Sequence, residues 1–269
     1  MTHKRSIIDA HTHVLPDKIA EKGASNIGAF YTLPHHAPAS VSALTAAGDS
    51  IGVYHYLTCS TATVPEQVEH INDFLANIIK NDGRFTALIA LHPDHTGYEE
   101  ELDRGMSLGL AGVKMHPDFQ RFDIDEERLL PIYRAIARRG LPLLIHLGDI
   151  RYDHSRPSKL AAIMKKVPDL TVIAPHFTGY QRWQESLDLL PPLENLWIDT
   201  SSSLGLLPYD MAMRLIEKHG VEKFMFGTDF PIWNPVLEVE KVERLALTED
   251  ELDGIFQHNF KKLFKINKI

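Results

Sequence analysis

Two histidines near the start of the chain have the spacing of metal ligands. The segment Ile7-Ile-Asp-Ala-His11-Thr-His13-Val14 has the composition of a β-strand. Side chains alternate between the two faces of a strand, so His11 and His13 are expected on the same face. Two imidazoles placed in this way can bind one metal ion together. The pair predicts a metal site, although a surface histidine pair would have the same spacing.

Further side chains of this chemistry follow other apolar runs. His146, His176 and Asp229 each stand at the end of such a run. Any one of them alone is more easily a structural group than a ligand. If the runs are strands of a closed barrel, their carboxyl ends form one ring, and the side chains converge there. Imidazoles together with a carboxylate suit Zn²⁺ with one position open to water.

The segment Gly112-Val-Lys114-Met-His116-Pro117 adds a cation and an imidazole to the same end of the expected barrel. Lys114 and His116 are two residues apart, so both are expected on one face. We expect them to bind a substrate carboxylate or to lie beside the metal. A lysine that extends to solvent at the rim is the alternative for Lys114.

The remaining candidates are residues that could orient a site histidine and residues expected to have structural or solvated positions. Asp199 with Ser201 and Ser202 ends another run and can orient a histidine, although a strand-end turn explains these residues equally well. Cys59 is expected to be a small core residue, and His92 to be structural. Three more histidines lie in connections, where a solvated position is the default and a place over the site is the alternative: His35, His36 and His154.

Eight apolar, β-branched runs supply the strands that must position these residues. They span residues 7–14, 53–58, 86–91, 112–115, 143–147, 171–174, 196–199 and 223–226. Most starts are separated by roughly 30 residues, the length of one strand–helix unit. The pattern predicts an α/β protein, a single (β/α)₈ TIM barrel that forms one domain over residues 1–269. An open doubly wound sheet is the alternative, but no Gly-x-Gly-x-x-Gly follows any run.

Amphipathic stretches between the runs predict the helices of these units. They lie at 65–80, 125–138, 157–167 and 209–219, and Thr248-Glu-Asp-Glu251 has the spacing of a capping box that opens a last helix ending at Phe264. The long connection over residues 16–38 is expected to be a functional loop that forms a wall over the site.

Charge and composition exclude several classes of partner. Asp and Glu number 36 against 28 Lys and Arg, which gives a net charge of −8 and argues against nucleic acid and anionic membranes as partners. No apolar run is long enough to span a membrane, and the first residues carry no signal-peptide core. One cysteine cannot form an intrachain disulfide. We expect a cytoplasmic protein with a small-molecule substrate, either a monomer or a homo-oligomer.

The ordered motifs resemble the amidohydrolase superfamily, in the amidohydrolase-related branch that includes aminocarboxymuconate-semialdehyde decarboxylase. They are His-x-His, Gly-Val-Lys-x-His-Pro, Ile-His-x-Gly, His-x-x-Gly and Phe-Gly-Thr-Asp-x-Pro, and they extend over essentially the whole chain. The resemblance implies a metal-dependent barrel with His11, His13, His146 and Asp229 as metal ligands. It places His176 beside the substrate or the metal's water. One motif departs from the branch, because Pro-His-Phe-Thr-Gly stands where Ala-His-Leu-Gly-Gly is usual.

Two reactions fit these residues. The first is hydrolysis of a small amide, ester or lactone by a metal-activated water, with Asp229 as the base and His176 as the polarising group. The second is non-oxidative decarboxylation of an aromatic or muconate-like acid. Hydrolysis is favoured because the strand ends offer Lys114 but no arginine to clamp a carboxylate. A barrel that binds metal or ligand without turnover is a third interpretation.

The expected cofactor is one divalent ion. Zn²⁺ suits the donors best, with Mn²⁺ and Fe²⁺ as alternatives. In binuclear relatives a carboxylated lysine bridges two ions, and Lys114 stands at that position. The neighbouring His116 and the resemblance to a mononuclear branch predict a single ion and an unmodified Lys114.

Overall fold

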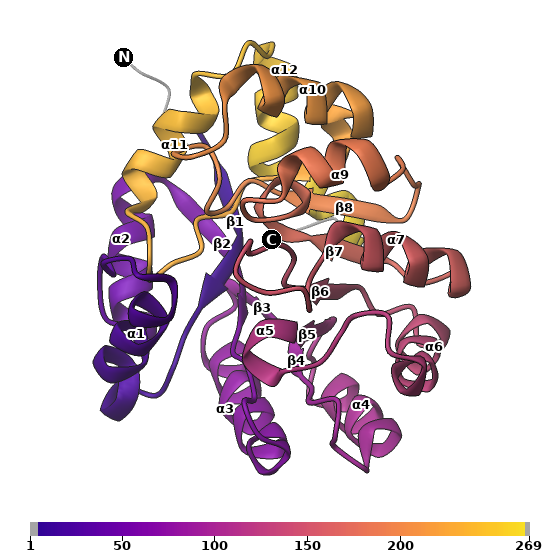
Figure 1. Cartoon of the computed structure of the whole chain (residues 1–269). Helices are drawn as coiled ribbons and strands as arrows, with labels where there is room; N and C mark the ends of the chain where they lie inside the picture. The colour runs from indigo at the N-terminus through magenta and orange to yellow at the C-terminus, as the bar shows by residue number, and fades with distance from the viewer. Residues whose placement is uncertain (1–4, 267–269) are drawn as a thin grey trace.

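A ring of parallel strands forms the centre of the molecule (Figure 1). The computed structural model describes residues 5–266. Apart from β3 and β4, which do not pair with each other, strands that follow one another in the chain pair in parallel. The strands are β1 (Ile7–His13), β2 (Val53–Cys59), β3 (Phe85–Ala87), β4 (Ile89–Ala90), β5 (Val113–Met115), β6 (Leu143–Ile145), β7 (Val172–Ala174), β8 (Leu196–Asp199) and β9 (Phe224–Met225).

The third expected run is interrupted rather than continuous. Leu88 separates β3 from β4, so the ladder divides into the sheets β1-β2-β3 and β4 to β9. The Leu88 amide donates to the Thr58 carbonyl at 3.1 Å, which keeps the two sheets in one ring. On the other side, the Ala10 amide donates to the Phe226 carbonyl at 2.7 Å. These bonds close the predicted (β/α)₈ barrel, which is confirmed.

Helices surround this ring and cover its outer face (Figure 1). The longer ones are α1 (Asp17–Tyr31), α2 (Val41–Ile51), α3 (Val68–Asn81), α4 (Tyr98–Ser107), α6 (Leu130–Arg138), α7 (Pro157–Lys166), α9 (Trp183–Leu189), α10 (Tyr209–His219) and α11 (Pro235–Glu243). The shorter ones are α5 (Pro117–Gln120), α8 (Pro175–Thr178), α12 (Glu249–Asp253) and α13 (Asn259–Phe264).

Most expected helices are confirmed, with differences at their ends. The stretches 65–80 and 125–138 each contain a 3₁₀ turn before the α-helix, at Pro65–Gln67 and Glu127–Leu129. The capping box at Thr248 and Glu251 is present. The last helix is not continuous, because a π-helical turn over Gly254–His258 separates α12 from α13.

The expectation of a loop over residues 16–38 was wrong, because this segment contains α1. The buried positions of α1 are Ala20, Ala24 and Gly28, four residues apart. Their small size lets α1 lie close to the chain that follows it; a Cβ at Gly28 would be 2.6 Å from the Leu33 carbonyl oxygen. A helix that buries small residues gives a weak apolar period, and the sequence pattern therefore missed it.

Apolar side chains fill the barrel below the site. Ile8, Leu57, Leu144 and Met225 come from four strands and pack together inside the ring. A larger apolar cluster packs the strands against the helices. Within residues 5–266, no helix is long and apolar enough to cross a membrane. Two expectations extend to residues 1–4 and 267–269, which lie outside the described residues. They concern the signal peptide and the ends of the domain over residues 1–269.

Candidate functional site

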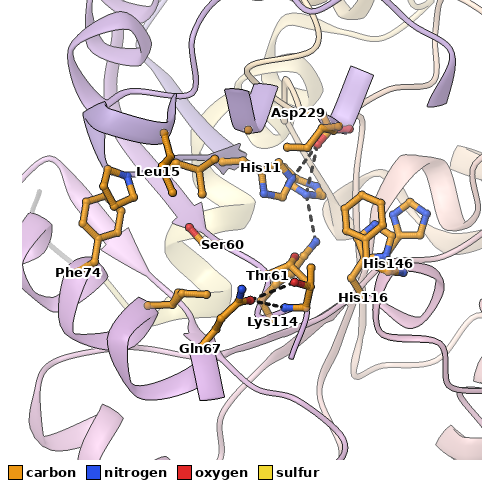
Figure 2. A pocket seen from close by; sticks show the side chains of 18 of the residues that line it. His11, Leu15, Ser60, Thr61, Gln67, Phe74, Lys114, His116, His146 and Asp229 are labelled. Atoms are coloured by element: carbon orange, nitrogen blue, oxygen red, sulfur yellow. Dashed lines mark hydrogen bonds and ion pairs between the residues drawn. The ribbon is translucent and has the colours of Figure 1, made fainter. Parts of the chain in front are cut away.

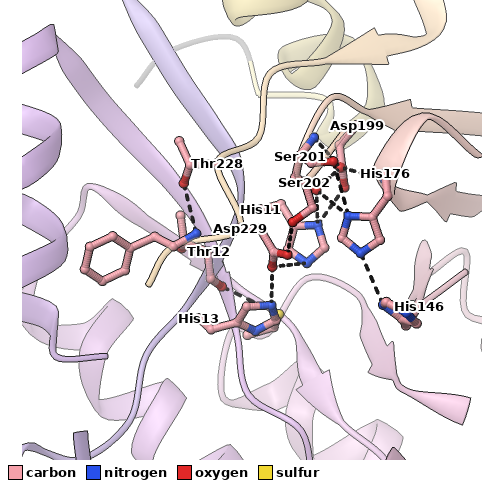
Figure 3. Close-up of polar contacts among 12 residues, drawn as sticks. His11, Thr12, His13, His146, His176, Asp199, Ser201, Ser202, Thr228 and Asp229 are labelled. Atoms are coloured by element: carbon pink, nitrogen blue, oxygen red, sulfur yellow. Dashed lines mark hydrogen bonds and ion pairs between the residues drawn. The ribbon is translucent and has the colours of Figure 1, made fainter. Parts of the chain in front are cut away.

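The side chains predicted from the strand ends meet at the carboxyl end of the barrel (Figure 3). His11 and His13 end β1, His146 follows β6, His176 lies in the turn after β7, and Asp229 follows β9. His176 and Asp229 have φ values of 61° and 58°, which non-glycine residues rarely adopt. Such backbone strain is typical of residues that are held in place for a function.

A buried carboxylate orients His11. Asp199 Oδ2 lies 2.8 Å from His11 Nδ1, and both side chains are fully buried. Because Nδ1 donates its proton to Asp199, His11 Nε2 carries a lone pair that can accept a hydrogen bond or bind a cation, and this nitrogen lies 3.7 Å from Asp229 Oδ1. The interpretation of Asp199 as an orienting group is supported over that of a plain turn.

His13 reaches the same carboxylate. Its Nε2 lies 3.0 Å from Asp229 Oδ1, and its Nδ1 lies 3.4 Å from Cys59 Sγ. Ser202 donates from its hydroxyl to the other oxygen of Asp229. Cys59 is buried as expected, but it also contacts a site histidine, and the sequence pattern did not indicate this contact.

His146 and His176 form a second pair beside the first. His146 Nδ1 lies 3.1 Å from His176 Nε2, and His176 Nδ1 lies 2.8 Å from Ser201 Oγ. The His176 ring stacks on His11 with the ring centroids 5.3 Å apart. Of the four predicted ligands, His11 and His13 therefore lie directly beside Asp229, whereas His146 joins them through His176.

The pKa shifts of most of these groups favour the protonation states that bind a cation. Burial lowers the pKa of His11 and of His146 below the ordinary value, and it lowers the pKa of His176 to about 4. Burial would raise the pKa of Asp229, but the hydrogen bond from His13 and the nearby imidazoles bring it well below its ordinary range. Neutral imidazoles and an ionised carboxylate are the forms that bind a metal ion.

His13 differs from the other imidazoles. Burial lowers its pKa, but the negative charges at Cys59 and Asp229 outweigh burial and raise the pKa to about 9. His13 is thus protonated at neutral pH and donates from Nε2 to Asp229 Oδ1. A divalent ion at this place would substitute for that proton, so the donor set fits a metal ion.

Lys114 and His116 lie on the same side of the site, as predicted. Lys114 is 1% exposed and its Nζ lies 3.4 Å from His11 Nε2. Lys114 lines the cavity, and none of the ion pairs among the described residues includes it. His116 accepts a hydrogen bond at Nδ1 from the Phe119 amide, and its Nε2 lies 3.0 Å from the Tyr31 hydroxyl.

These residues form the inner end of a cavity of about 410 Å³ (Figure 2). Tyr31 also lines it and contacts His116 and His146 through its hydroxyl. Tyr31 was not among the residues predicted from the sequence, because α1 was expected to be a loop. The helical spacing of Ile19, Gly23, Ile27 and Tyr31 was the signal that could have identified it.

Several other histidines stay outside the site. His35 pairs with Glu21 at 3.0 Å, and His154 with Asp123 at 2.7 Å. The described cavity lining includes none of His35, His36 and His154, so these residues do not cover the site. His92 accepts from the Asp94 amide at 3.1 Å, which agrees with the expected structural role.

Comparison with known proteins shows the family and the fold of the chain. The sequence matches the amidohydrolase family over residues 8–266. No curated protein matches it. A solved 2,6-dihydroxybenzoate decarboxylase from Rhizobium has 17% sequence identity and a TM-score of 0.75, covering 98% of this chain and 100% of that one.

Two further solved structures share the fold. A dihydroxybenzoic acid decarboxylase from Polaromonas, with bound manganese and the inhibitor 2-nitroresorcinol, has 16% identity and a TM-score of 0.76, covering 98% of both chains. A putative 2-pyrone-4,6-dicarboxylic acid hydrolase from Pseudomonas putida has 16% identity and a TM-score of 0.70, covering 99% of this chain and 100% of that one. At this identity the likeness shows the fold alone.

Proposed function

The chain belongs to the amidohydrolase family, and from that premise we propose that it is a metal-dependent decarboxylase of an aromatic monocarboxylic acid. The sequence favoured hydrolysis over decarboxylation, and we now place decarboxylation first. That preference rested on the absence of an arginine at the strand ends. The buried Lys114 can take the same role, because a desolvated ammonium can also bind a carboxylate. Decarboxylases of similar fold support the same choice.

The observation that carries the proposal is the uneven charge of the cavity. Lys114 is the single lysine among the described lining residues, and none of them is an arginine. It lies at the inner end, beside His11, and most of the remaining wall is apolar. A substrate with one carboxylate and an apolar ring matches this distribution, because a second carboxylate would find no cation and would lose its hydration.

A divalent ion fits at the same inner end. The residues that would hold it are His11, His13, His146 and Asp229, with His176 beside it. When bound, the ion would supply positive charge that polarises the substrate's carboxylate or a neighbouring oxygen. Nitrogen and oxygen donors together suit Zn²⁺, Mn²⁺ or Fe²⁺, and the Polaromonas protein carries manganese.

Asp229 is the proposed catalytic acid. In the reaction the bond between the ring carbon and the carboxylate carbon breaks, CO₂ leaves, and the electron pair stays on the ring carbon. Asp229, ionised at rest, first accepts a proton from solvent and then passes it to that carbon, which returns Asp229 to its ionised form. Ser202 holds Asp229 in place by its hydroxyl hydrogen bond, and Trp233 Nε1 donates to Ser202 at 2.7 Å. His176, held by Ser201, orients the substrate.

Hydrolysis is the second candidate, because the same residues also support it. Asp229 can accept a proton from water, and His176 can polarise a carbonyl group. The hydrolase named for a dicarboxylic substrate shares the fold. With Lys114 as the single cationic lining residue among those described, a monoanionic or neutral lactone or ester fits this cavity better than a dicarboxylate.

The two candidates differ in their products. Purified protein is loaded with Mn²⁺ or Zn²⁺ and incubated with aromatic monocarboxylic acids, lactones and esters. CO₂ release that is lost on chelation and in Asp229→Asn supports decarboxylation. A chelator-sensitive hydrolytic product without CO₂ would establish hydrolysis instead. If neither product forms with any metal, the proposal of an enzyme acting on these classes is wrong.

A further inference from the structure

Two helices present apolar faces to each other across the outer half of the cavity. The lining positions on α1 are Ile19, Gly23, Ile27 and Tyr31. The lining positions on α3 include Ile71 and Phe74. Residues three or four apart share one helix face, so each helix directs a single face into the cavity. Leu15 and Phe74 lie at the opposite side of the cavity from His116 and His146 (Figure 2).

The outer half differs from the inner half in charge. Lys114 and Asp229 lie at the inner end, next to His11. The described lining of the outer half contains no lysine, arginine or carboxylate, and its polar residues Thr63, Gln67 and His70 are exposed at the rim. Ile19 is 42% exposed, so this half opens to solvent. An apolar group can be buried here, whereas an anionic group would be unpaired.

Gly23 leaves room for the Leu15 side chain at the wall of this half. A Cβ atom at Gly23 would lie 2.0 Å from Leu15 Cδ1, which also lines the cavity. A side chain at position 23 would therefore enter the space between α1 and α3 or displace Leu15 into it. Gly23 lies inside a 15-residue helix, where glycine is unfavourable by about 1 kcal/mol relative to alanine. The close approach of Leu15 explains a glycine at this helical position.

We infer that the outer half of the cavity binds an apolar alkyl or aryl substituent of the substrate. The substrate is then a monocarboxylic acid whose carboxylate lies at Lys114 and whose substituent extends between α1 and α3. Gly23 determines how large this substituent can be. The inference rests on the proposed function, because it takes the end beside Lys114 as the end that binds the reacting carboxylate.

Binding measured apart from turnover tests this inference. Dissociation constants of benzoate, 4-ethylbenzoate, 4-butylbenzoate and isophthalate are measured by calorimetry on the metal-loaded enzyme. Each buried methylene is expected to strengthen binding by up to about fourfold. Isophthalate is expected to bind more weakly than 4-ethylbenzoate. Equal constants along the alkyl series, or tighter binding of isophthalate, would overturn the inference, as would no binding of any 4-alkylbenzoate.

A matched pair of variants locates the effect. Gly23→Val is expected to reduce the ratio of the benzoate constant to the 4-butylbenzoate constant by about tenfold or more. Ser25→Val changes an exposed position of the same helix and is expected to keep the wild-type ratio. If Gly23→Val keeps the wild-type ratio, the alkyl substituent does not bind between α1 and α3. Should Gly23→Val fail to fold, the wild-type alkyl series still decides.

The outcome for the proposed function is separate. CO₂ release is followed with the same acids. If affinity rises along the alkyl series but no CO₂ forms, the decarboxylase proposal fails while the apolar binding site remains. If CO₂ forms but affinity does not change with the length of the alkyl chain, the decarboxylase proposal stands and the apolar binding site is wrong.

Discussion

Asp199 Oδ2 lies 2.8 Å from His11 Nδ1, and neither side chain is reached by solvent. The contact fixes which nitrogen of His11 carries the proton and turns Nε2 toward Asp229. Burial opposes ionisation of Asp199, but its electrostatic interaction and hydrogen bond with His11 keep its pKa below the ordinary value. A carboxylate that orients a ligand in this way commonly affects metal affinity about as strongly as a weak ligand does.

Asp199→Asn should therefore weaken metal binding. The substitution keeps the shape but removes the charge that makes His11 a stronger donor, so we expect metal affinity to fall about 10- to 100-fold. Competition with a chromogenic chelator measures the affinity, and circular dichroism checks the fold. Asp169→Asn, at an exposed position, is the matched control and should bind metal like the wild type. Unchanged affinity in Asp199→Asn would remove Asp199 from the site.

Asp229→Asn should reduce the chemical step. Loss of a general acid or base lowers rates by about 10²-fold or more. We expect a loss of at least that size in turnover at saturating metal, with thermal unfolding close to that of the wild type. His92→Ala is the control from another strand end and should keep turnover nearly intact, because His92 is absent from the described cavity lining. Wild-type turnover in metal-loaded Asp229→Asn would exclude Asp229 from the mechanism.

The protein should bind one tightly held ion, with Lys114 unmodified. A second ion beside Lys114 would need donors there, but Nδ1 of His116 accepts from the Phe119 amide and its Nε2 contacts the Tyr31 hydroxyl. Elemental analysis should give one equivalent of metal per chain, and the intact mass should equal that of the unmodified sequence. Two equivalents, or the added mass of a carboxyl group on Lys114, would contradict this expectation.

His55 should make the fold sensitive to acid. Burial lowers its pKa from 6.5 to about 4, and its Nδ1 has no hydrogen-bond partner among the described residues. The unfolded chain therefore binds a proton that the folded chain resists between these pH values. The free energy of unfolding should decrease by up to about 3 kcal/mol as the pH drops from 6.5 toward 4. Above pH 6.5 it should not depend on the titration of His55.

Urea unfolding at pH 7 and pH 5 measures this loss. His55→Gln keeps a polar atom near the Thr86 hydroxyl, which lies 2.8 Å from His55 Nε2, but it cannot titrate. The variant should lose less stability than the wild type between the two pH values. His258→Gln, at an exposed position, should behave like the wild type. An equal loss in His55→Gln and the wild type would show that other groups cause the acid sensitivity.

The barrel and the neighbourhood of the site could be predicted from the chain alone. Regularly spaced apolar runs require parallel strands with helical connections, and in a closed ring all strands end on one edge. This is why His11, His13, His176 and Asp229 could be placed together although up to 218 residues separate them. The charge of Lys114 at the same edge followed from the same alternation along its strand.

Other features depended on tertiary contacts that no local pattern encodes. The small residues Ala20, Ala24 and Gly28 gave no strong period, because they were selected by how closely α1 approaches its neighbours. The contact of His146 with His176, and not with Asp229 directly, is set by left-handed backbone at His176 and by ring packing. The apolar space between α1 and α3 exists because two separate helices face each other. The sequence alone thus determined which groups gather at the site, whereas the depth and charge of the cavity arose from packing between distant elements.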